Sequence, residues 1–412
     1  MAKARAYLDW NATAPLHPAA REAVLRALDT IGNPSSIHAE GRAARALVEE
    51  ARAGVAALVG GEAENVIFTS GATEAANALL GADQAGFSPI FLCGDDHPPR
   101  GAVIYGETEH PCVIAAALRA MDLAGAALLP IKPQPDGCLS PGALAGMLER
   151  ARPLQPEGAR PLVAIQLANN ETGVLQDIPA LAETARAGGA IVIVDAAQGP
   201  GRVEIDINKL GADALFLSAH KFGGPKGVGA IVFAHGTTRL ARAFIPGGGQ
   251  ERGQRGGTEN VPGILGMGAA ARAAKADFDP ETLIELRDRF ENHLKTIAPE
   301  VRIVGEGVAR LPNTSLFAIP GVTAEKALIA FDLAGVAVSS GSACSSGKVK
   351  ASHVLEAMGE QGWVKAGAIR LSIGPTTTAA DIDQALGVVD QLAKREKVKN
   401  SASKGAFAVS AA

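Results

Sequence analysis

The sequence has few aromatic residues and few cysteines, and it contains no long apolar run. Aromatic side chains make up only 4% of the 412 residues, so alanine and branched aliphatic side chains must fill the core. The longest apolar runs fall well short of the roughly 18 residues that a membrane-spanning helix needs. The opening residues, M-A-K-A-R-A-Y-L-D-W, also lack the apolar segment of a secretory signal. These absences predict a cytoplasmic protein with no membrane partner.

The charge balance argues against a further group of functions. The formal net charge is −4, which gives the chain no electrostatic reason to bind nucleic acid or an anionic membrane surface. Apolar residues make up 47% and charged residues 20%, as in an ordinary soluble globular protein. The chain is too long for one small core, so two domains are expected.

The four cysteines are too scattered to form a metal or disulfide framework. Cys93, Cys112, Cys138 and Cys344 show neither C-x-x-C spacing nor a nearby pair of histidines. Cys344 lies in V-S-S-G-S-A-C-S-S-G-K-V-K (338–350), where small residues surround the thiol. Two interpretations are open: an accidental cysteine in a polar surface loop, or a thiol nucleophile that must move.

Helical spacing alternates with short apolar runs from about residue 18 onward. Residues 19–28 and 41–60 have helical periodicity, and Gly60-Gly61 ends the second helix. Nearly continuous apolar runs at 65–70, 101–106, 162–169, 190–195 and 212–218 are typical of strands buried on both faces of a parallel sheet. This pattern predicts an α/β fold. Ligands of such sheets bind where the strands end, which directs attention to Thr69-Ser70, Asn169-Asn170, Asp195 and Ser218.

A second unit follows the glycine-rich segment G-G-G-Q-E-R-G-Q-R-G-G-T-E-N (247–260). Residues 279–295 have helical spacing, and 314–319 and 368–373 have the character of strands. We expect a large domain over 16–263, a smaller domain over 1–15 and 264–395, and a C-terminal tail over 396–412. Residues 86–101 mix apolar and turn-forming residues and predict a long loop.

Three features at the predicted strand ends point to one cofactor. Lys221 follows the strand A-L-F-L, and a partly desolvated lysine can form a Schiff base, although most lysines are solvated surface charges. Asp195 ends an apolar strand, where a carboxylate needs a cationic partner such as a protonated pyridine nitrogen. The run F-T-S-G-A-T-E places the N–H groups of 71–73 at a helix start, which favours an anion. Each feature alone has an ordinary structural explanation, but together they predict a pyridoxal-phosphate enzyme.

The chain resembles the cysteine desulfurases. The resemblance covers roughly residues 6–395 and lies in motifs that occur in the family's order: Y-L-D-W-N-A-T-A-P, N-P-S-S-I-H, F-T-S-G-A-T-E-A, T-E-H, N-N-E-T-G-V-L-Q, D-A-A-Q, S-A-H-K-F-G-G-P-K-G-V-G, G-G-G-Q-E-R-G-Q-R-G-G-T-E-N and S-S-G-S-A-C-S-S-G. It implies a fold-type I pyridoxal-phosphate transferase with a mostly parallel seven-stranded sheet in the large domain and a smaller α+β domain. It also implies a homodimer that converts L-cysteine to L-alanine and supplies sulfur for iron–sulfur cluster assembly.

The same resemblance assigns the cofactor-binding residues. Lys221 is expected to hold pyridoxal phosphate covalently, with Asp195 at the ring nitrogen and Gln198 with Asn170 at the ring oxygen or the substrate. The phosphate is expected to contact a further set: Ala72, Thr73, Ser218 and His220 of one chain, and Thr258 of the partner chain.

The remaining assignments concern substrate and sulfur. His110 is expected to stack on the ring and relay protons, and Arg370 to bind the substrate carboxylate with its planar fork. Cys344 is expected to receive the sulfur as a persulfide and pass it to a sulfur-acceptor or iron–sulfur scaffold protein. Cys344 could also bind an iron–sulfur cluster transiently, and no other metal is expected.

Some positions depart from the family pattern, and other functions compete. Thr13-Ala14 stands where two threonines are common, and Pro375 stands where arginine is common. His38 lies in a family motif without an assigned role. Selenocysteine lyase or another class V pyridoxal-phosphate enzyme, such as an aminotransferase, is the alternative activity. A catalytically silent scaffold for cluster assembly is the non-enzymatic alternative.

Overall fold

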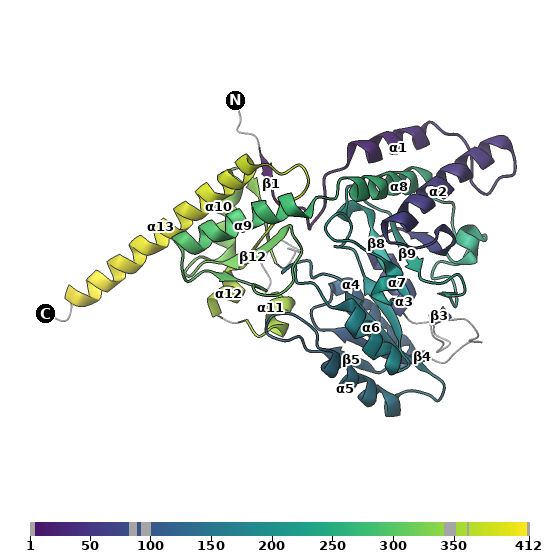
Figure 1. Cartoon of the computed structure of the whole chain (residues 1–412), viewed down its shortest axis with the longest axis horizontal. Helices are drawn as coiled ribbons and strands as arrows, with labels where there is room; N and C mark the ends of the chain where they lie inside the picture. Colours follow the sequence, from purple (N-terminus) through teal and green to yellow (C-terminus); the bar gives the residue numbers. More distant parts are fainter. Residues whose placement is uncertain (1–4, 82–88, 92–99, 342–351, 361, 410–412) are drawn as a thin grey trace. The chain divides into compact units, whose positions relative to one another are not determined.

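The computed structural model describes residues 5–81, 89–91, 100–341, 352–360 and 362–409. Its chain forms two compact units (Figure 1). The larger unit comprises Thr13–Asn169 and Leu175–Phe278, and the smaller comprises Met1–Ala12, Asn170–Val174 and Asp279–Ala412. Within the described residues, the structure holds no helix with the length and hydropathy that crossing a membrane requires.

The larger unit is built on a seven-stranded sheet. In spatial order its strands are β2 (Val66–Thr69), β9 (Gly229–Phe233), β8 (Ala214–Ser218), β7 (Ile191–Asp195), β6 (Arg160–Gln166), β4 (Arg100–Gly106) and β5 (Leu128–Ile131). Strand β9 is antiparallel to both of its neighbours, and the other neighbouring pairs are parallel. The prediction of a mostly parallel seven-stranded sheet is therefore confirmed.

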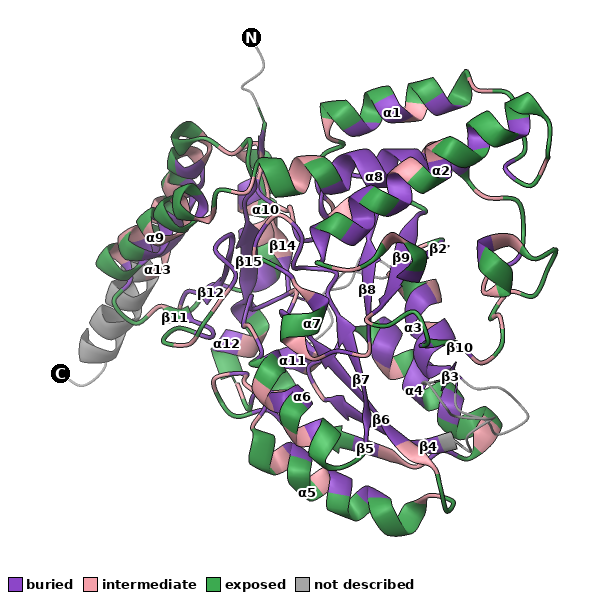
Figure 2. Cartoon of the chain, turned by 45° about the vertical axis from the view of Figure 1, so that its right-hand side comes forward, coloured by how far each residue is buried: buried purple, intermediate pink, exposed green. Residues whose placement is uncertain are grey.

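Helices cover both faces of this sheet, because its strands are apolar on both sides (Figure 2). One buried cluster joins alternate strand residues to α1 (Pro18–Leu28), α2 (Ala39–Leu58), α5 (Pro141–Ala151), α6 (Ile178–Ala187) and α8 (Val261–Ala276). The other joins the intervening strand residues to α3 (Ala72–Leu80) and α4 (Pro111–Ala124). Since successive strand residues point to opposite faces, the two clusters are the two sides of one sheet.

Short elements complete the larger unit. They are helix α7 (Ile207–Leu210), the 3-10 turns Ala63–Asn65, Arg152–Leu154, Ala219–Lys221 and Gln250–Gly253, and the antiparallel pair β3 (Ile90–Phe91) with β10 (Arg239–Leu240). Strand β3 lies inside the predicted loop 86–101, of which 86–88 and 92–99 fall outside the described residues.

The smaller unit is an α+β arrangement. Its four-stranded sheet has the order β11 (Arg302–Ile303), β12 (Thr314–Ala318), β15 (Ile369–Ser372) and β14 (Ser339–Ser340), and β1 (Ala6–Tyr7) pairs in parallel with β13 (Val336–Ala337). Its helices are α9 (Pro280–Ile297), α10 (Ala324–Leu333), α11 (His353–Ala357), α12 (Gly362–Gly367) and α13 (Ala379–Val409).

The unit boundaries differ from the expected domain boundaries in four places. Residues 13–15, expected in the smaller domain, belong to the larger unit. The expected boundary at 263 falls inside helix α8. This helix belongs wholly to the larger unit because its apolar side chains pack with α1 and α2. Residues 170–174 pack with the smaller unit although both flanking segments belong to the larger one. Helix α13 continues to Val409 through the region expected to be a tail, where alanine and lysine are frequent and favour helix.

Candidate active site

Strand alternation directs the polar residues at the sheet edge toward α3 and α4. In β7, Ile191 and Ile193 belong to the cluster on the α3–α4 face, so Asp195 two residues later has the same orientation. The same count in β8, from Ala214 and Phe216, places Ser218 on that face. Helices α3 and α4 begin at this edge, so the sequence motifs that precede them meet Asp195 and Ser218 there.

The start of α3 lies beside the end of β8. Across the sheet, Thr69 is in register with Gly229, and Gly229 with Ser218. Gly71, the N-cap of α3, has a φ of 155°, and a Cβ on Gly229 would lie only 2.7 Å from the Gly71 Cα. The glycines thus let the two strand ends approach closely, so the N–H groups of Ala72 and Thr73 share an edge with the Ser218 hydroxyl. A helix start with free N–H groups and a hydroxyl suits a phosphate.

Positive charge surrounds the 3-10 turn that follows Ser218. Burial and the charges of Lys221, Lys226 and Arg202 lower the pKa of His220 to about 4. His220 is therefore neutral near pH 7 and can donate one hydrogen bond, while the neighbouring cations favour an anion. This part of the site fits the phosphate of pyridoxal phosphate.

Asp195 provides the complementary end of the site. Its Oδ1 accepts a hydrogen bond from the Ala197 N–H at 2.9 Å. Burial raises the pKa of Asp195 to about 6, although the Ala197 hydrogen bond and the charge of Lys221 act in the opposite direction. A buried carboxylate with this pKa is stabilised by a cationic partner, and a protonated pyridine nitrogen is one. The residues of the larger unit therefore fit pyridoxal phosphate at both of its ends.

The Asp195 carboxyl predicts a pH dependence for the cofactor-free protein. Its folded pKa lies above the unfolded value of about 3.9, so the folded chain holds an extra proton between about pH 4 and pH 6. The extra proton contributes roughly 3 kcal/mol to the free energy of unfolding below this window, and this contribution is lost as pH rises through it. Urea unfolding of the cofactor-free protein should show this loss, and Asp195→Asn should make it smaller by removing the Asp195 contribution, leaving that of Glu109, whose pKa burial also raises. A variant whose stability falls with pH as steeply as that of the wild type would contradict the assignment.

His110 begins α4, and a network of buried amides holds its turn. Its Nδ1 accepts the N–H of Cys112 at 3.2 Å and lies 3.0 Å from the Cys112 Sγ. Gln166 donates to both the carbonyl and the hydroxyl of Thr108 at 3.0 Å, and the Gln166 N–H donates to Glu109 at 2.8 Å. His110 itself is exposed. The network fixes the backbone position of His110 and leaves its ring accessible to a ligand.

Gln198 and Lys221 share a buried arginine that the sequence interpretation missed. Arg202 donates to the Gln198 side-chain oxygen at 2.7 Å and to the Lys221 carbonyl at 3.0 Å. The guanidinium thus ties the D-A-A-Q turn to the S-A-H-K turn. An arginine four residues after Gln198 carried no sequence signal of this contact, which depends on the fold.

In the smaller unit, Arg370 lies with Asn170 and Asp9. Its Nη1 donates to the Asn170 carbonyl at 2.9 Å and its Nη2 to Asp9 at 2.7 Å. The Arg370 Nε is buried and has no hydrogen-bond partner among the described residues. The fork expected to bind a substrate carboxylate is therefore partly occupied by protein groups, and Nε is the donor that remains.

Thr258 lies in the glycine-rich segment 247–260, which two ion pairs attach to the rest of the larger unit. Glu251 is buried and accepts two hydrogen bonds from Arg52, at 2.8 and 2.9 Å, and one from the Phe68 N–H. Glu251 and Arg252 both have left-handed backbones, with φ of 46° and 57°. Thr258 itself is exposed.

The second ion pair predicts an effect on cofactor affinity. Burial raises the pKa of Glu74 in the first turn of α3, but hydrogen bonds from Arg255 and Ser70 bring it below the ordinary value. Arg255→Gln should leave this carboxylate unneutralised beside the proposed phosphate site and weaken pyridoxal-phosphate binding about tenfold. Titrating the cofactor-free protein by absorbance measures this. Adding Glu74→Gln should restore part of the affinity, and Arg26→Gln, from an exposed ion pair with Glu50, is the control. Unchanged affinity in Arg255→Gln would contradict the prediction.

Several predicted positions have structural roles or lie outside the description. His38 is the N-cap of α2, where its Nδ1 accepts the Gly41 N–H at 3.3 Å. The Ala14 N–H donates to the His220 carbonyl at 2.7 Å, so this position contacts the lysine turn through its backbone. Pro375 is exposed after β15. Cys344 falls outside the described residues.

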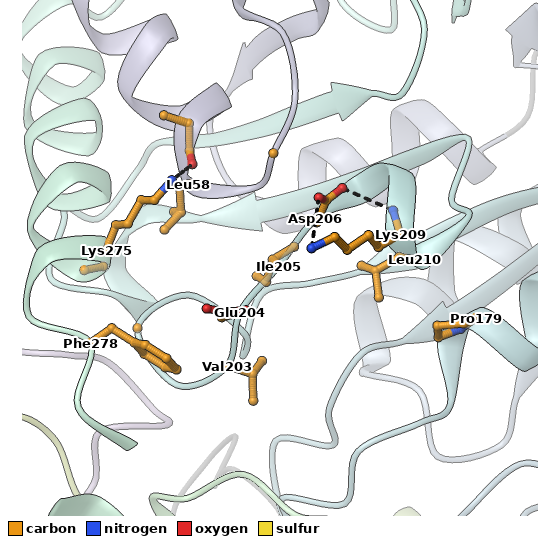
Figure 3. Close-up of a pocket in the computed structure, with 14 residues that line it drawn as sticks. Leu58, Pro179, Val203, Glu204, Ile205, Asp206, Lys209, Leu210, Lys275 and Phe278 are labelled. Atoms are coloured by element: carbon orange, nitrogen blue, oxygen red, sulfur yellow. Dashed lines mark hydrogen bonds and ion pairs between the residues drawn. The ribbon is translucent and has the colours of Figure 1, made fainter. Parts of the chain in front are cut away.

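A pocket of about 480 Å³ in the larger unit is a different feature (Figure 3). It is lined by residues that precede β2 and β8, such as Ile205, Asp206, Lys209 and Leu210, and by the end of α8. Its two lysines have protein partners: Lys275 donates to the Ala57 carbonyl at 2.8 Å, and Lys209 lies 3.9 Å from Asp206. None of the predicted site residues lines this pocket, which lies before the strands rather than after them.

Comparison with known proteins places this chain in a family. The aminotransferase class-V family model matches residues 6–385. A cysteine desulfurase of Cereibacter sphaeroides is 40% identical over 94% of this chain and 96% of its own length. The cysteine desulfurase IscS of Dictyoglomus turgidum is 35% identical, over 95% of each chain. The crystal structure of a NifS-like protein from Rickettsia africae is similar with a TM-score of 0.81 and 32% identity, covering 94% of this chain and 99% of that one.

Proposed function

Since this chain belongs to the aminotransferase class-V family and is a pyridoxal-phosphate-dependent cysteine desulfurase, we propose that Lys221, His110 and Cys344 carry out its reaction. The observation that supports this most is the buried Asp195, which lies within electrostatic range of Lys221 at the end of the sheet. The substrate is L-cysteine and the carbon product is L-alanine.

The bound cofactor supplies an electron-withdrawing ring that weakens the bonds at the substrate's Cα. Asp195 keeps a positive charge on the ring nitrogen, and the N–H groups of Ala72 and Thr73, with Ser218 and His220, hold the phosphate. Gln198 orients the ring oxygen through its contact with Arg202. Asn170 and Arg370 act on the substrate, with the buried Nε of Arg370 donating to the substrate carboxylate.

The chain's own groups then move protons and one sulfur atom. The Lys221 amine takes the Cα proton, and His110 relays protons at the face of the ring. The Cys344 thiolate attacks the substrate sulfur, so an S–S bond forms and the substrate C–S bond breaks with its electron pair on carbon. That carbon takes a proton, and Cα regains the proton that Lys221 removed, which leaves L-alanine and a persulfide on Cys344.

The persulfide is the form in which sulfur reaches a partner. We infer a sulfur-acceptor or iron–sulfur scaffold protein as that partner, and iron–sulfur cluster assembly as the process. Cys112 and Cys138 are free thiols in the described structure, which agrees with a reducing cytoplasm.

The activity is tested by incubating the cofactor-loaded enzyme with L-cysteine and a thiol reductant. Equal amounts of L-alanine and sulfide are expected. L-selenocysteine in a parallel reaction measures the preference between the two substrates. Failure to form L-alanine from L-cysteine would contradict the proposal.

Thr258 predicts a shared site in a homodimer. A two-fold dimer is the commonest assembly, and the exposed Thr258 would then contact the partner's phosphate. Thr258→Val should bind pyridoxal phosphate about tenfold more weakly, while light scattering still gives a dimer. In mixed dimers of Thr258→Val and Lys221→Ala, one site regains both wild-type residues, so half of the sites should bind the cofactor with full affinity. A fully active monomer, or mixed dimers without a high-affinity site, would exclude this arrangement.

A further inference from the structure

Glu171 belongs to a short segment that the smaller unit holds firmly. The Asn170 carbonyl accepts hydrogen bonds from Arg370 and from the Asn11 amide, and the Gly173 carbonyl accepts one from the Leu311 N–H at 2.7 Å. Because both sides of Glu171 are fixed, its buried side chain has a defined place in that unit.

One oxygen of Glu171 meets the chain at two separate points. Its Oε2 accepts a hydrogen bond of 2.6 Å from the Ser352 hydroxyl. The same Oε2 fills the space beside Gly341, where an added Cβ would collide with it. Residues 341 and 352 flank the segment that contains Cys344. A single buried carboxyl oxygen therefore contacts both ends of that segment.

Each of these two ends is fixed by further contacts. Gly341 directly follows β14, in which Ser339 is in register with Arg370 and Ser340 with Ile369. The Ser352 hydroxyl accepts the Leu355 N–H at 3.1 Å and so begins α11. The ends are thus joined to rigid elements, and Glu171 lies between them.

The charges around Glu171 connect it with the substrate residue. Burial raises the pKa of its carboxyl, while the Ser352 hydrogen bond and the charges of His353 and Arg370 act to lower it. These are the titratable groups that face Glu171 from α11 and β15. Arg370, proposed above to bind the substrate carboxylate, therefore lies in the electrostatic range of the group that contacts both ends of the Cys344 segment.

We propose that Glu171 is a positioning residue that holds Gly341 and Ser352 together and so sets the reach of Cys344 toward the substrate. This inference rests on the proposed function, in which Cys344 is the sulfur acceptor. Fixing both ends of a chain segment raises the effective concentration of a group within it, because fewer conformations place that group elsewhere. Loss of the contact lowers the rate of attack on sulfur without removing any group that binds the cofactor.

The test measures persulfide formation on Cys344 in a single turnover by mass spectrometry, at saturating L-cysteine. Glu171→Ala and Ser352→Ala should each slow persulfide formation at least about tenfold. Gly341→Ala should do the same, because its new Cβ displaces Oε2. The absorbance titrations for pyridoxal phosphate and L-cysteine should stay unchanged. Glu171→Gln, which retains an oxygen acceptor, should recover most of the rate, and Glu171→Ala with Ser352→Ala should be no slower than either alone.

Ser315→Ala is the matched control, since its buried hydroxyl has no hydrogen-bond partner among the described residues. Wild-type persulfide rates in Ser352→Ala and Gly341→Ala would overturn the inference, even if Glu171→Ala failed to fold. Equal losses of L-cysteine affinity and of persulfide rate in these variants would also overturn the inference. Such losses would mean that the variants weaken substrate binding by Arg370. Full alanine and sulfide production by Cys344→Ser would instead refute the proposed function on which it rests.

Discussion

Replacing Lys221 with alanine is expected to reduce alanine formation from L-cysteine by at least about a thousandfold. Lys221 ends the 3-10 turn Ala219–Lys221, directly after β8, and Arg202 holds its carbonyl. This support places its amine at the strand end where Asp195 and the start of α3 meet. Without that amine, both the covalent attachment of the cofactor and the removal of the Cα proton are lost. The measurements are alanine production and borohydride trapping of the cofactor on the protein.

Lys226 provides the control for this experiment. It is an exposed lysine five residues later, in the same glycine-rich run. Lys226→Ala should retain the trapped cofactor and most of the activity. A Lys221→Ala enzyme whose cofactor is still trapped by borohydride would show that another amine is the attachment site.

Replacing Cys344 with serine should abolish persulfide formation while leaving cofactor and L-cysteine binding intact. A serine hydroxyl is a poor nucleophile toward sulfur, and its product could not carry a transferable sulfur atom. Sulfide release in the presence of reductant should fall at least about a thousandfold. Mass spectrometry of the protein after one turnover gives the position of the added sulfur.

The other described cysteines serve as controls because they are poor nucleophiles. Burial, with the Asp136 carboxylate nearby, raises the pKa of Cys138 to about 11. Burial and the charges of Asp195 and Glu109 raise the pKa of Cys112 still further. Since the thiolate is the reactive form, Cys112→Ser and Cys138→Ser should retain the persulfide. Added sulfur on Cys112 or Cys138 in the wild type would contradict the assignment of Cys344.

The sheet and its ligand edge could be predicted because their signals are local. Strands buried on both faces read as continuous apolar runs, and their polar last residues mark the edge where ligands bind. Asp195 and Ser218 are each the polar residue that ends such a run, so the sequence alone identifies them. Alternation along the strand then explains why both face α3 and α4.

The long-range ion pairs that hold segment 247–260 in place could not be predicted in the same way. The pair Arg52–Glu251 joins residues separated by 199 positions, and Arg255–Glu74 joins residues separated by 181. Such pairs depend on which helices and turns the fold brings together, and periodicity carries no information about that. The packing of 170–174 with the smaller unit was missed for the same reason. The family motifs were the only available signal for the other supporting residues, because these lie within them: Glu74, Glu109, Glu171 and Arg255.

The left-handed backbone at Glu251 and Arg252 also bears on the order of folding. For residues other than glycine this conformation costs roughly 1–2 kcal/mol each, so segment 247–260 depends on its contacts with Arg52 and Phe68. Those residues lie in α2 and β2, and the segment takes its shape once these elements have packed. A surface that carries Thr258 therefore forms on a chain that is already folded. In the proposed homodimer, refolding should accordingly end with a concentration-dependent association step, slower at low protein concentration, after the sheet has acquired its native structure.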